Sequence, residues 1–231
     1  MRRIIIATFG VALLLAGCKV GNQSPSGTEP EAAQEQKAAA EPQNTVKEDS
    51  SATENLEIKE DMNIEPKYRI ATTKGDIVIK LYEQTPLHKQ NFMKLAQSGF
   101  YEGICFHRVI NGFMIQVGDP LTKDPEMESH WGEGGPGYTI PAEIVEGLTH
   151  KKGAIAAARR GNSVNPAKES SGSQFYIVQD ENGCKHLDGE YTIFGEVVSG
   201  FEVIDRIASV ATDFKDKPTN PIEITSVTPV N

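Results

Sequence analysis

The side chains best suited to chemistry lie close together in residues 106–119, where one arginine stands among two phenylalanines, a methionine and a glutamine. Strand-like alternation places Arg108 on the same face as Phe106, with His107 and Val109 on the opposite face. A guanidinium stays protonated and presents a rigid fork of donors. We therefore expect Arg108 to act by hydrogen bonding and electrostatic stabilisation rather than by proton transfer.

A turn is expected in the middle of this stretch. Asn111 and Gly112 are typical of a two-residue hairpin connection, because both tolerate positive φ. The turn would fold three further side chains back toward Arg108, namely Phe113, Met114 and Gln116. Together these residues form the candidate site, and the alternative is an ordinary hairpin with a surface arginine.

Motifs for other chemistries are missing from the sequence. There is no Gly-x-Ser-x-Gly elbow, and the five histidines lack the spacing of a metal site, so we expect neither a metal nor a cofactor. The glycine-rich run at 132–137 is not followed by Gly-Lys-Ser/Thr, which argues against a nucleotide and favours a rigid loop that approaches its neighbours closely. The formal charge of −9 argues against nucleic acid, which is bound through basic patches.

The candidate site needs a scaffold, and the flanking sequence begins with a hairpin and a helix. Alternation predicts the hairpin over residues 68–82, with its turn at 74–75. Thr85 as the N-cap and Pro86 as the first helical residue then begin a helix that ends at Gly99. Its apolar stripe is expected at Leu87, Phe92, Leu95 and Ala96.

The rest of the chain predicts further short strands. They are expected near residues 138–140, 154–158, 174–179, 192–197 and 222–227. Only one more helix is expected, at residues 201–208. Many short strands with two helices indicate an all-β fold in which the sheet closes into an antiparallel barrel. Because side chains fill such a barrel, a ligand must bind on its outer surface or at a mouth.

The N-terminus predicts export. Two arginines precede an apolar run at residues 4–15, which is too short for an ordinary membrane span. The next residues, Leu15-Ala16-Gly17-Cys18, resemble the lipobox of bacterial lipoproteins, in which the cysteine is lipid-modified. We expect residues 1–18 to be a lipoprotein signal peptide and Cys18 to carry the membrane anchor. A plain cleaved signal and an uncleaved anchor are the alternatives.

The composition changes after the signal. Residues 19–66 hold eleven acidic and four basic side chains and almost no large apolar ones, so they cannot bury enough surface to offset their chain entropy. We expect a disordered acidic tether there and a folded domain at 67–231. Cys105 and Cys184 remain in the folded domain, and two separate thiols are favoured over a disulfide because Cys105 is expected on the strand face opposite Arg108.

Four blocks of sequence together resemble the cyclophilins, a family of peptidyl-prolyl cis-trans isomerases. The blocks are Phe106-His107-Arg108, the run from Gly112 to Asp119, Gly172-Ser173-Gln174-Phe175, and the run from Leu187 to Gly195. The resemblance extends from Tyr68 to the C-terminus and implies an eight-stranded barrel closed by two helices. It also implies a cofactor-free isomerase of X-Pro bonds whose partners are proline-containing unfolded or extended polypeptides.

The resemblance also implies roles for individual residues. The implied catalytic residues are Arg108, Phe113 and Gln116. The implied substrate-binding residues are His107, Met114, Gly132, Ala158, Arg159, Gln174, Tyr176, His186, Leu187 and Tyr191. In the family, the walls of the proline pocket correspond to Phe113, Met114, Tyr176 and Leu187. The backbone of Ala158-Arg159 would pair with the substrate, and Gly132 would line the neighbouring groove.

Four positions depart from the best-known eukaryotic pattern. Tyr176 stands for a phenylalanine, His186 for a tryptophan, Tyr191 for a histidine and Arg159 for an asparagine. The missing indole implies weak inhibition by cyclosporin, and the pair of His186 and Tyr191 is similar to bacterial members. We expect a monomer that is anchored to a bacterial membrane, on the periplasmic side of the outer membrane. The alternatives to an isomerase are a peptide-binding chaperone module with little turnover and a structural lipoprotein.

Overall fold

The computed structural model describes residues 65–230. The expected signal peptide, Cys18 and the expected tether as far as residue 64 lie outside these residues. The strands are β1 Lys67–Thr72, β2 Gly75–Leu81, β3 Arg108–Ile110, β4 Met114–Val117, β5 Thr139–Ile140, β6 Ala154–Ala157, β7 Ser170–Ser171, β8 Phe175–Val178, β9 Ile193–Ser199 and β10 Ile224–Val230. The α-helices are α1 Pro86–Gln97 and α2 Phe201–Ala208, and the 3-10 helices are η1 Pro120–Lys123, η2 Pro125–His130 and η3 Lys185–Leu187.

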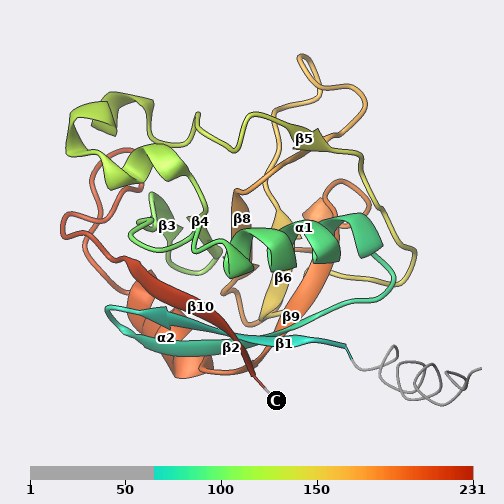
Figure 1. Ribbon diagram of the computed structural model, residues 1–231, viewed down its shortest axis with the longest axis horizontal. Helices are drawn as coiled ribbons and strands as arrows, with labels where there is room; N and C mark the ends of the chain where they lie inside the picture. The colour runs from blue at the N-terminus through green and yellow to red at the C-terminus, as the bar shows by residue number, and fades with distance from the viewer. Residues whose placement is uncertain (1–64, 231) are drawn as a thin grey trace, which may run out of the picture. The chain divides into compact units, whose positions relative to one another are not determined.

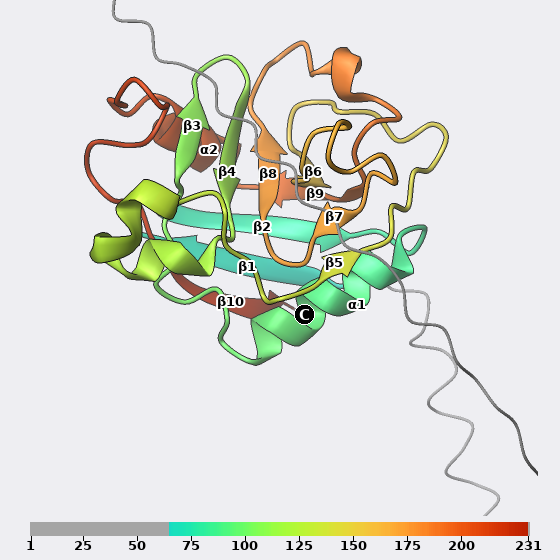
Figure 2. The same ribbon diagram turned by 90° about the horizontal axis from the view of Figure 1, so that it is seen from above.

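Eight of the strands form one curled antiparallel sheet in the order β10-β1-β2-β9-β6-β8-β4-β3. Its two edge strands approach each other just before β3 and β10, where Cys105 and Glu223 form an isolated antiparallel bridge. Two backbone hydrogen bonds flank this bridge, from Phe106 N to Ile222 O and from Ile224 N to Ile104 O, each at 2.9 Å. The expected eight-stranded antiparallel fold is therefore confirmed, and a short contact joins its edges. Figure 2 shows α1 and α2 on opposite sides of the curled sheet.

The hydrophobic core is formed by this sheet together with both helices, and its aromatic part lies against helix α1. Four aromatic rings meet there, with the Phe92 ring 5.2 Å from Tyr101, 5.8 Å from Phe175 and 6.1 Å from Phe194, measured between centroids. Buried aromatic side chains contribute much of the area that stabilises a domain of this size. Figure 1 shows α1 lying across the strands that supply Phe175 and Phe194, which are β8 and β9.

Helix α1 begins at Pro86 and is followed by Gly99 at φ +69°, as expected. Its N-terminal cap is supplied from far away in the sequence. Thr85 makes no side-chain cap, and the carboxylate of Glu143 instead accepts hydrogen bonds from Leu87 N and His88 N, both at 3.0 Å. The expected apolar stripe is wrong at Leu87, which is 47% exposed, because His88 occupies the inward position beneath Glu143.

Other sequence predictions need smaller corrections. The first hairpin turns at residues 73–74 rather than 74–75, and β5 pairs only with β7, a short strand that the sequence did not predict. The second helix has the expected bounds. Cys105 and Cys184 are both buried free thiols, which confirms the separate cysteines. Among residues 65–230, no helix is long and apolar enough to cross a membrane.

Candidate active site

The β3–β4 hairpin carries the candidate cation. Arg108 pairs with Gln116 across the two strands, and Ile110 pairs with Met114. The connection holds three residues rather than the expected two, and only Gly112 among them has positive φ, at +76°. The third of these residues, Phe113, donates its backbone N–H to Ile110 O at 3.1 Å. The longer loop still brings Phe113 to the same cavity as Arg108.

The prediction that Phe106 lies on the same face as Arg108 is wrong. Phe106 and Val109 both lie in the main core, whereas Arg108 points to the surface. Strict alternation fails because the backbone changes partner within this stretch: Phe106 N bonds to Ile222 O in the segment that precedes β10, whereas His107 N already bonds to Gln116 O of β4. A strand that changes partners at this point does not keep one continuous set of faces.

A cavity of about 130 Å³ lies beside Arg108. The residues that line it come from β3, the β3–β4 connection, β4, β8, η3 and the segments that follow β6 and η3. They are Arg108, Phe113, Met114, Gln116, Ala158, Arg159, Tyr176, Leu187 and Tyr191. All nine were expected at the site from the sequence. The cavity combines the half-exposed Arg108 guanidinium with aromatic and aliphatic walls, so it can bind a small apolar ring and stabilise partial negative charge beside it.

A buried chain of hydrogen bonds supports the Tyr176 wall from behind. The Tyr176 hydroxyl lies 2.9 Å from His150 Nε2, and His150 Nδ1 lies 2.8 Å from Asp188 Oδ1. Asp188 also accepts a bond from His150 N at 2.8 Å, and it directly follows the wall residue Leu187. Sequence reasoning missed His150, since nothing in its neighbourhood connects it with a residue of β8. Asp188 stood within the Leu187 block without an assigned role.

Burial shifts the pKa values of all three side chains in this series of hydrogen bonds. It lowers the pKa of His150, although the hydrogen bond that the His150 ring donates to Asp188 opposes the shift. Burial also raises the pKa of the Tyr176 hydroxyl, which keeps that group neutral. Burial favours the neutral form of Asp188 too, but the bonds from the backbone and ring of His150 outweigh it and hold the pKa of this carboxyl below its usual value. The neutral imidazole can thus donate to Asp188 and accept from Tyr176.

Arg159 is held inside the rim of the cavity, with its side chain 4% exposed. Its guanidinium lies 4.6 Å from the centre of the Tyr191 ring and donates to Glu190 O at 2.8 Å and Asn162 Oδ1 at 2.7 Å. Ala158 N donates to Gln174 O at 3.0 Å and Ala158 O accepts from Ser171 N at 2.8 Å. Of the expected Ala158-Arg159 pair, Arg159 is therefore the residue whose backbone remains available to a peptide.

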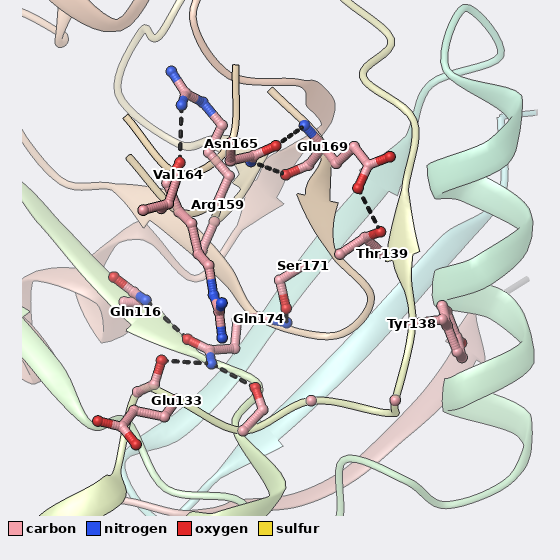
Figure 3. A pocket seen from close by; sticks show the side chains of 16 residues that line it. Gln116, Glu133, Tyr138, Thr139, Arg159, Val164, Asn165, Glu169, Ser171 and Gln174 are labelled. Atoms are coloured by element: carbon pink, nitrogen blue, oxygen red, sulfur yellow. Dashed lines mark hydrogen bonds between the residues drawn. The ribbon is translucent and has the colours of Figure 1, made fainter. Parts of the chain in front are cut away.

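A larger hollow of about 1010 Å³ lies next to this cavity and shares Gln116, Ala158 and Arg159 with it. Gln174 organises the boundary. Its amide oxygen accepts from Gln116 Nε2 at 3.1 Å, and its amide nitrogen donates to Gly132 O at 3.0 Å and Gly134 O at 2.7 Å (Figure 3). The two polar side chains expected at the site are thus connected to each other and to the glycine-rich loop.

Asp119 holds the glycine-rich loop against Gln174. Its carboxylate accepts from the backbone N–H groups of Leu121, Gly132 and Gly134. A Cβ atom at Gly134 would lie 2.1 Å from Asp119 Oδ1, so no larger residue fits there without a shift. This confirms the close approach that the sequence predicted for the loop, and it shows the role of Asp119, which sequence reasoning left unassigned.

The remaining expected residues lie around the cavity without lining it. Gly132 and Gln174 line the larger hollow. His186 stacks on Phe113 with the ring centres 5.9 Å apart, so it contacts a wall of the cavity from outside. His107 is buried behind Arg108, and burial lowers its pKa to about 4. Within residues 65–230, neither ring nitrogen of His107 has a hydrogen-bond partner.

A family model, curated relatives and solved structures all match this chain to one family. The model of the family described as cyclophilin type peptidyl-prolyl cis-trans isomerase/CLD matches residues 67–229. The peptidyl-prolyl cis-trans isomerase of Helicobacter pylori is 39% identical over 156 residues, which cover 65% of this chain and 86% of that protein. Peptidyl-prolyl cis-trans isomerase 10 of Caenorhabditis elegans is 38% identical over 161 residues, which cover 69% and 92%.

Some relatives are much longer than the matched region. The match spans 28% of the peptidyl-prolyl cis-trans isomerase-like 2 of Rhizopus delemar and 24% of isomerase 9 of Schizosaccharomyces pombe. Among solved structures, a cyclophilin type isomerase of Cryptosporidium parvum is 32% identical, covers 72% of this chain and 98% of its own, and superposes with a TM-score of 0.63. A second structure of that protein, determined in the presence of the dipeptide Ala-Pro, gives a TM-score of 0.62 at 31% identity.

Proposed function

The chain belongs to the cyclophilin-type peptidyl-prolyl cis-trans isomerases, and on this premise we propose that its 130 Å³ cavity binds the proline ring of a peptide while Arg108 accelerates rotation about the X-Pro bond. The observation that carries the proposal is the position of the Arg108 guanidinium at the edge of a small cavity walled by Phe113, Met114 and Tyr176. The Ala-Pro dipeptide named for the solved relative supports a ligand of this class.

The reaction needs a group that stabilises a twisted amide. Amide resonance sets a barrier of about 18–20 kcal/mol to rotation, and twisting the bond breaks this resonance and localises a lone pair on the proline nitrogen. A guanidinium placed near that nitrogen stabilises the twisted state more than either planar isomer, which is the condition for catalysis. The walls hold the ring while the preceding residue rotates, and no covalent bond is made or broken.

Two side chains would orient the peptide during this rotation. Gln116 faces the cavity beside Arg108, and Gln174 holds the Gln116 amide and the loop carbonyls of Gly132 and Gly134. The backbone of Arg159 would bond to the peptide on the opposite side. These groups are fixed before the substrate arrives, so little conformational entropy is lost when the peptide binds.

The proposed substrates are X-Pro bonds in unfolded or extended extracytoplasmic proteins, whose folding the enzyme would assist. The support comes from the sequence before residue 67, with its short apolar run, its lipobox-like Leu15-Ala16-Gly17-Cys18 and its acidic tether. Lys19 stands where an aspartate would favour inner-membrane retention under the enterobacterial sorting rule, so the outer membrane is the proposed location. An anchored enzyme would act on chains soon after they cross the inner membrane.

Exchange spectroscopy on a proline peptide tests the proposed reaction. The full chain should speed interconversion of the cis and trans signals of an Ala-Pro peptide at catalytic concentrations. Peptide shifts that change on binding without faster exchange would instead indicate the chaperone module. For the location, Cys18→Ser should move the protein from the membrane fraction to the soluble fraction, and an unchanged membrane fraction would reject the lipid anchor.

A further inference from the structure

The loop between α2 and β10 places a carboxylate beside the candidate catalytic arginine. Asp216 Oδ2 lies 3.7 Å from Arg108 Nε, and both side chains are about half exposed, at 45% and 44%. Figures 1 and 2 both show this loop, in orange-red, beside strand β3 and the η1–η2 segment. Neither the sequence blocks of the family resemblance nor the cavity lining includes Asp216.

The backbone of the loop fixes the position of Asp216. Asp216 O accepts from Val109 N at 2.7 Å, so the carboxylate is tied to the residue that directly follows Arg108. Asp216 has φ +63°, and it is one of two non-glycine residues with positive φ among residues 65–230. Aspartate and asparagine tolerate this conformation better than most residues. A residue held in an uncommon backbone conformation next to a functional group is a reason to ask what it does there.

The loop is also braced from inside. Asp213 N donates to Lys217 O at 2.8 Å, and Asp213 Oδ1 accepts from Lys215 N at 2.8 Å and Lys217 N at 3.0 Å. Thr212 and Pro218 form an isolated bridge at its base. These bonds make the tip a compact turn, so the Asp216 carboxylate is presented from a defined backbone.

The long segment after β4 braces the loop from outside. The Lys217 ammonium forms an ion pair with Glu128 and lies 5.7 Å from the centre of the Trp131 ring. Glu128 belongs to η2, and Trp131 directly follows it. Neither residue lines the 130 Å³ cavity, so these contacts give the segment at 120–131 a structural connection to Arg108 through the Asp216 loop.

We propose that Asp216 is a positioning residue that orients the Arg108 guanidinium for the isomerase reaction. The ion pair uses Nε, so Nη1 and Nη2 remain available to the substrate, and the planar guanidinium cannot then rotate freely away from the cavity. The inference rests on the catalytic role proposed for Arg108. It adds that catalysis depends on a carboxylate from a loop far away in the sequence.

Asp216→Asn in the full chain is the direct test, because asparagine keeps the shape of the side chain and tolerates positive φ. The expected result is a fall in kcat/KM of about threefold to fivefold, the effect of an exposed ion pair at the upper end of its range. The fall should come from kcat, with KM and the thermal midpoint nearly unchanged. Glu202→Gln is the matched control, since it removes an exposed carboxylate from the first turn of α2, outside the loop that carries Asp216, and it should leave kcat/KM unchanged.

A double-mutant cycle shows whether Asp216 acts through Arg108. In an Arg108→Ala background, Asp216→Asn should cause no further loss. The NMR signal of Arg108 Nε–H gives a second measurement that needs no residual activity, and it should shift in Asp216→Asn and not in Glu202→Gln. Unchanged or increased activity in Asp216→Asn, an equal loss in the Arg108→Ala background, or an unmoved Nε–H signal would each overturn the proposal. If Arg108→Ala itself keeps full activity, the proposed role of Arg108 fails instead.

Discussion

The two sides of the 130 Å³ cavity are held in opposite ways. The apolar side rests on the buried chain from Tyr176 through His150 to Asp188, whose three heavy-atom distances are 2.8, 2.8 and 2.9 Å. The cationic side rests on one half-exposed ion pair between Arg108 and Asp216 at 3.7 Å. Solvent screens the second contact more strongly than the first, in which the His150 side chain is fully buried and that of Asp188 is 28% exposed.

The difference separates stability from catalysis. Buried polar groups are costly when they lose a partner, so the apolar side should dominate the free energy of unfolding. Exposed ion pairs contribute about 0–1 kcal/mol to stability, so Arg108 should matter little to folding and much to turnover. Substitutions on the two sides of the cavity should therefore give opposite patterns in activity and stability measurements.

The largest expected effect is on the cationic side. Arg108→Ala should lower kcat/KM for a proline peptide by about 10²- to 10³-fold, since it removes the charge that stabilises the twisted amide. Its free energy of unfolding should change by less than about 1 kcal/mol. Exchange spectroscopy and urea denaturation measure the two quantities. Near-normal turnover of Arg108→Ala, or a large loss of its stability, would contradict the proposal that the cationic side serves catalysis and the apolar side serves stability.

The next effect is on the apolar side. His150→Ala should lower the free energy of unfolding by roughly 3 kcal/mol, because it leaves the Tyr176 hydroxyl unpaired and opens a cavity. Tyr176→Phe is the matched variant, since it removes only the hydroxyl and keeps the ring wall. It should cost about 1 kcal/mol in urea denaturation and keep most of the turnover. If His150→Ala were as stable as the unchanged protein, the hydrogen bonds of His150 would contribute nothing to the free energy of unfolding.

The smallest effect is a pH dependence of stability, to which the apolar side contributes through His150. Burial lowers the pKa of His150 from 6.5, so the unfolded state takes up the proton first and stability falls as the pH drops below about 6.5. Asp188, with a pKa below 3.8, adds a further loss in stronger acid. The slope of stability against pH between about 6.5 and 4 should be shallower in His150→Ala than in the unchanged chain.

The control for this slope is His130→Ala, which replaces an exposed histidine of η2. The slope should not vanish entirely in His150→Ala, because burial also lowers the pKa values of His88 and His107. Urea denaturation at a series of pH values measures it. An identical slope in His150→Ala and the unchanged chain would contradict the assignment.

Local patterns were enough to predict the elements and much of the site. The proline and glycine that bound α1, the stripe of α2 and the alternation of the first hairpin all depend on neighbouring residues, and the structure places these elements within a residue or two. The nine residues that line the cavity were all expected at the site, because the sequence blocks that carry the family resemblance hold most of them.

The errors and omissions share one physical cause, which is contact between distant parts of the chain. The sequence pattern predicted that Leu87 is buried. No residue near Leu87 in the sequence indicates that Glu143 caps the helix or that His88 lies on the buried side. Phe106 and Arg108 lie on different faces because the backbone of Phe106 bonds to Ile222. His150 and Asp216 reach the site from loops without any local periodicity, so no pattern in their own neighbourhoods could have found them.

The pairing of β1 with β10 has a consequence for how the domain is made. Lys67 pairs with Val230, so the first strand to be synthesised lies next to the last one. β1 can complete its hydrogen bonds only after the whole domain has left the ribosome. Pairings of such long sequence separation slow folding, because the chain must close a long loop before the contact forms. The domain should therefore complete its fold only once β10 is free to pair with β1.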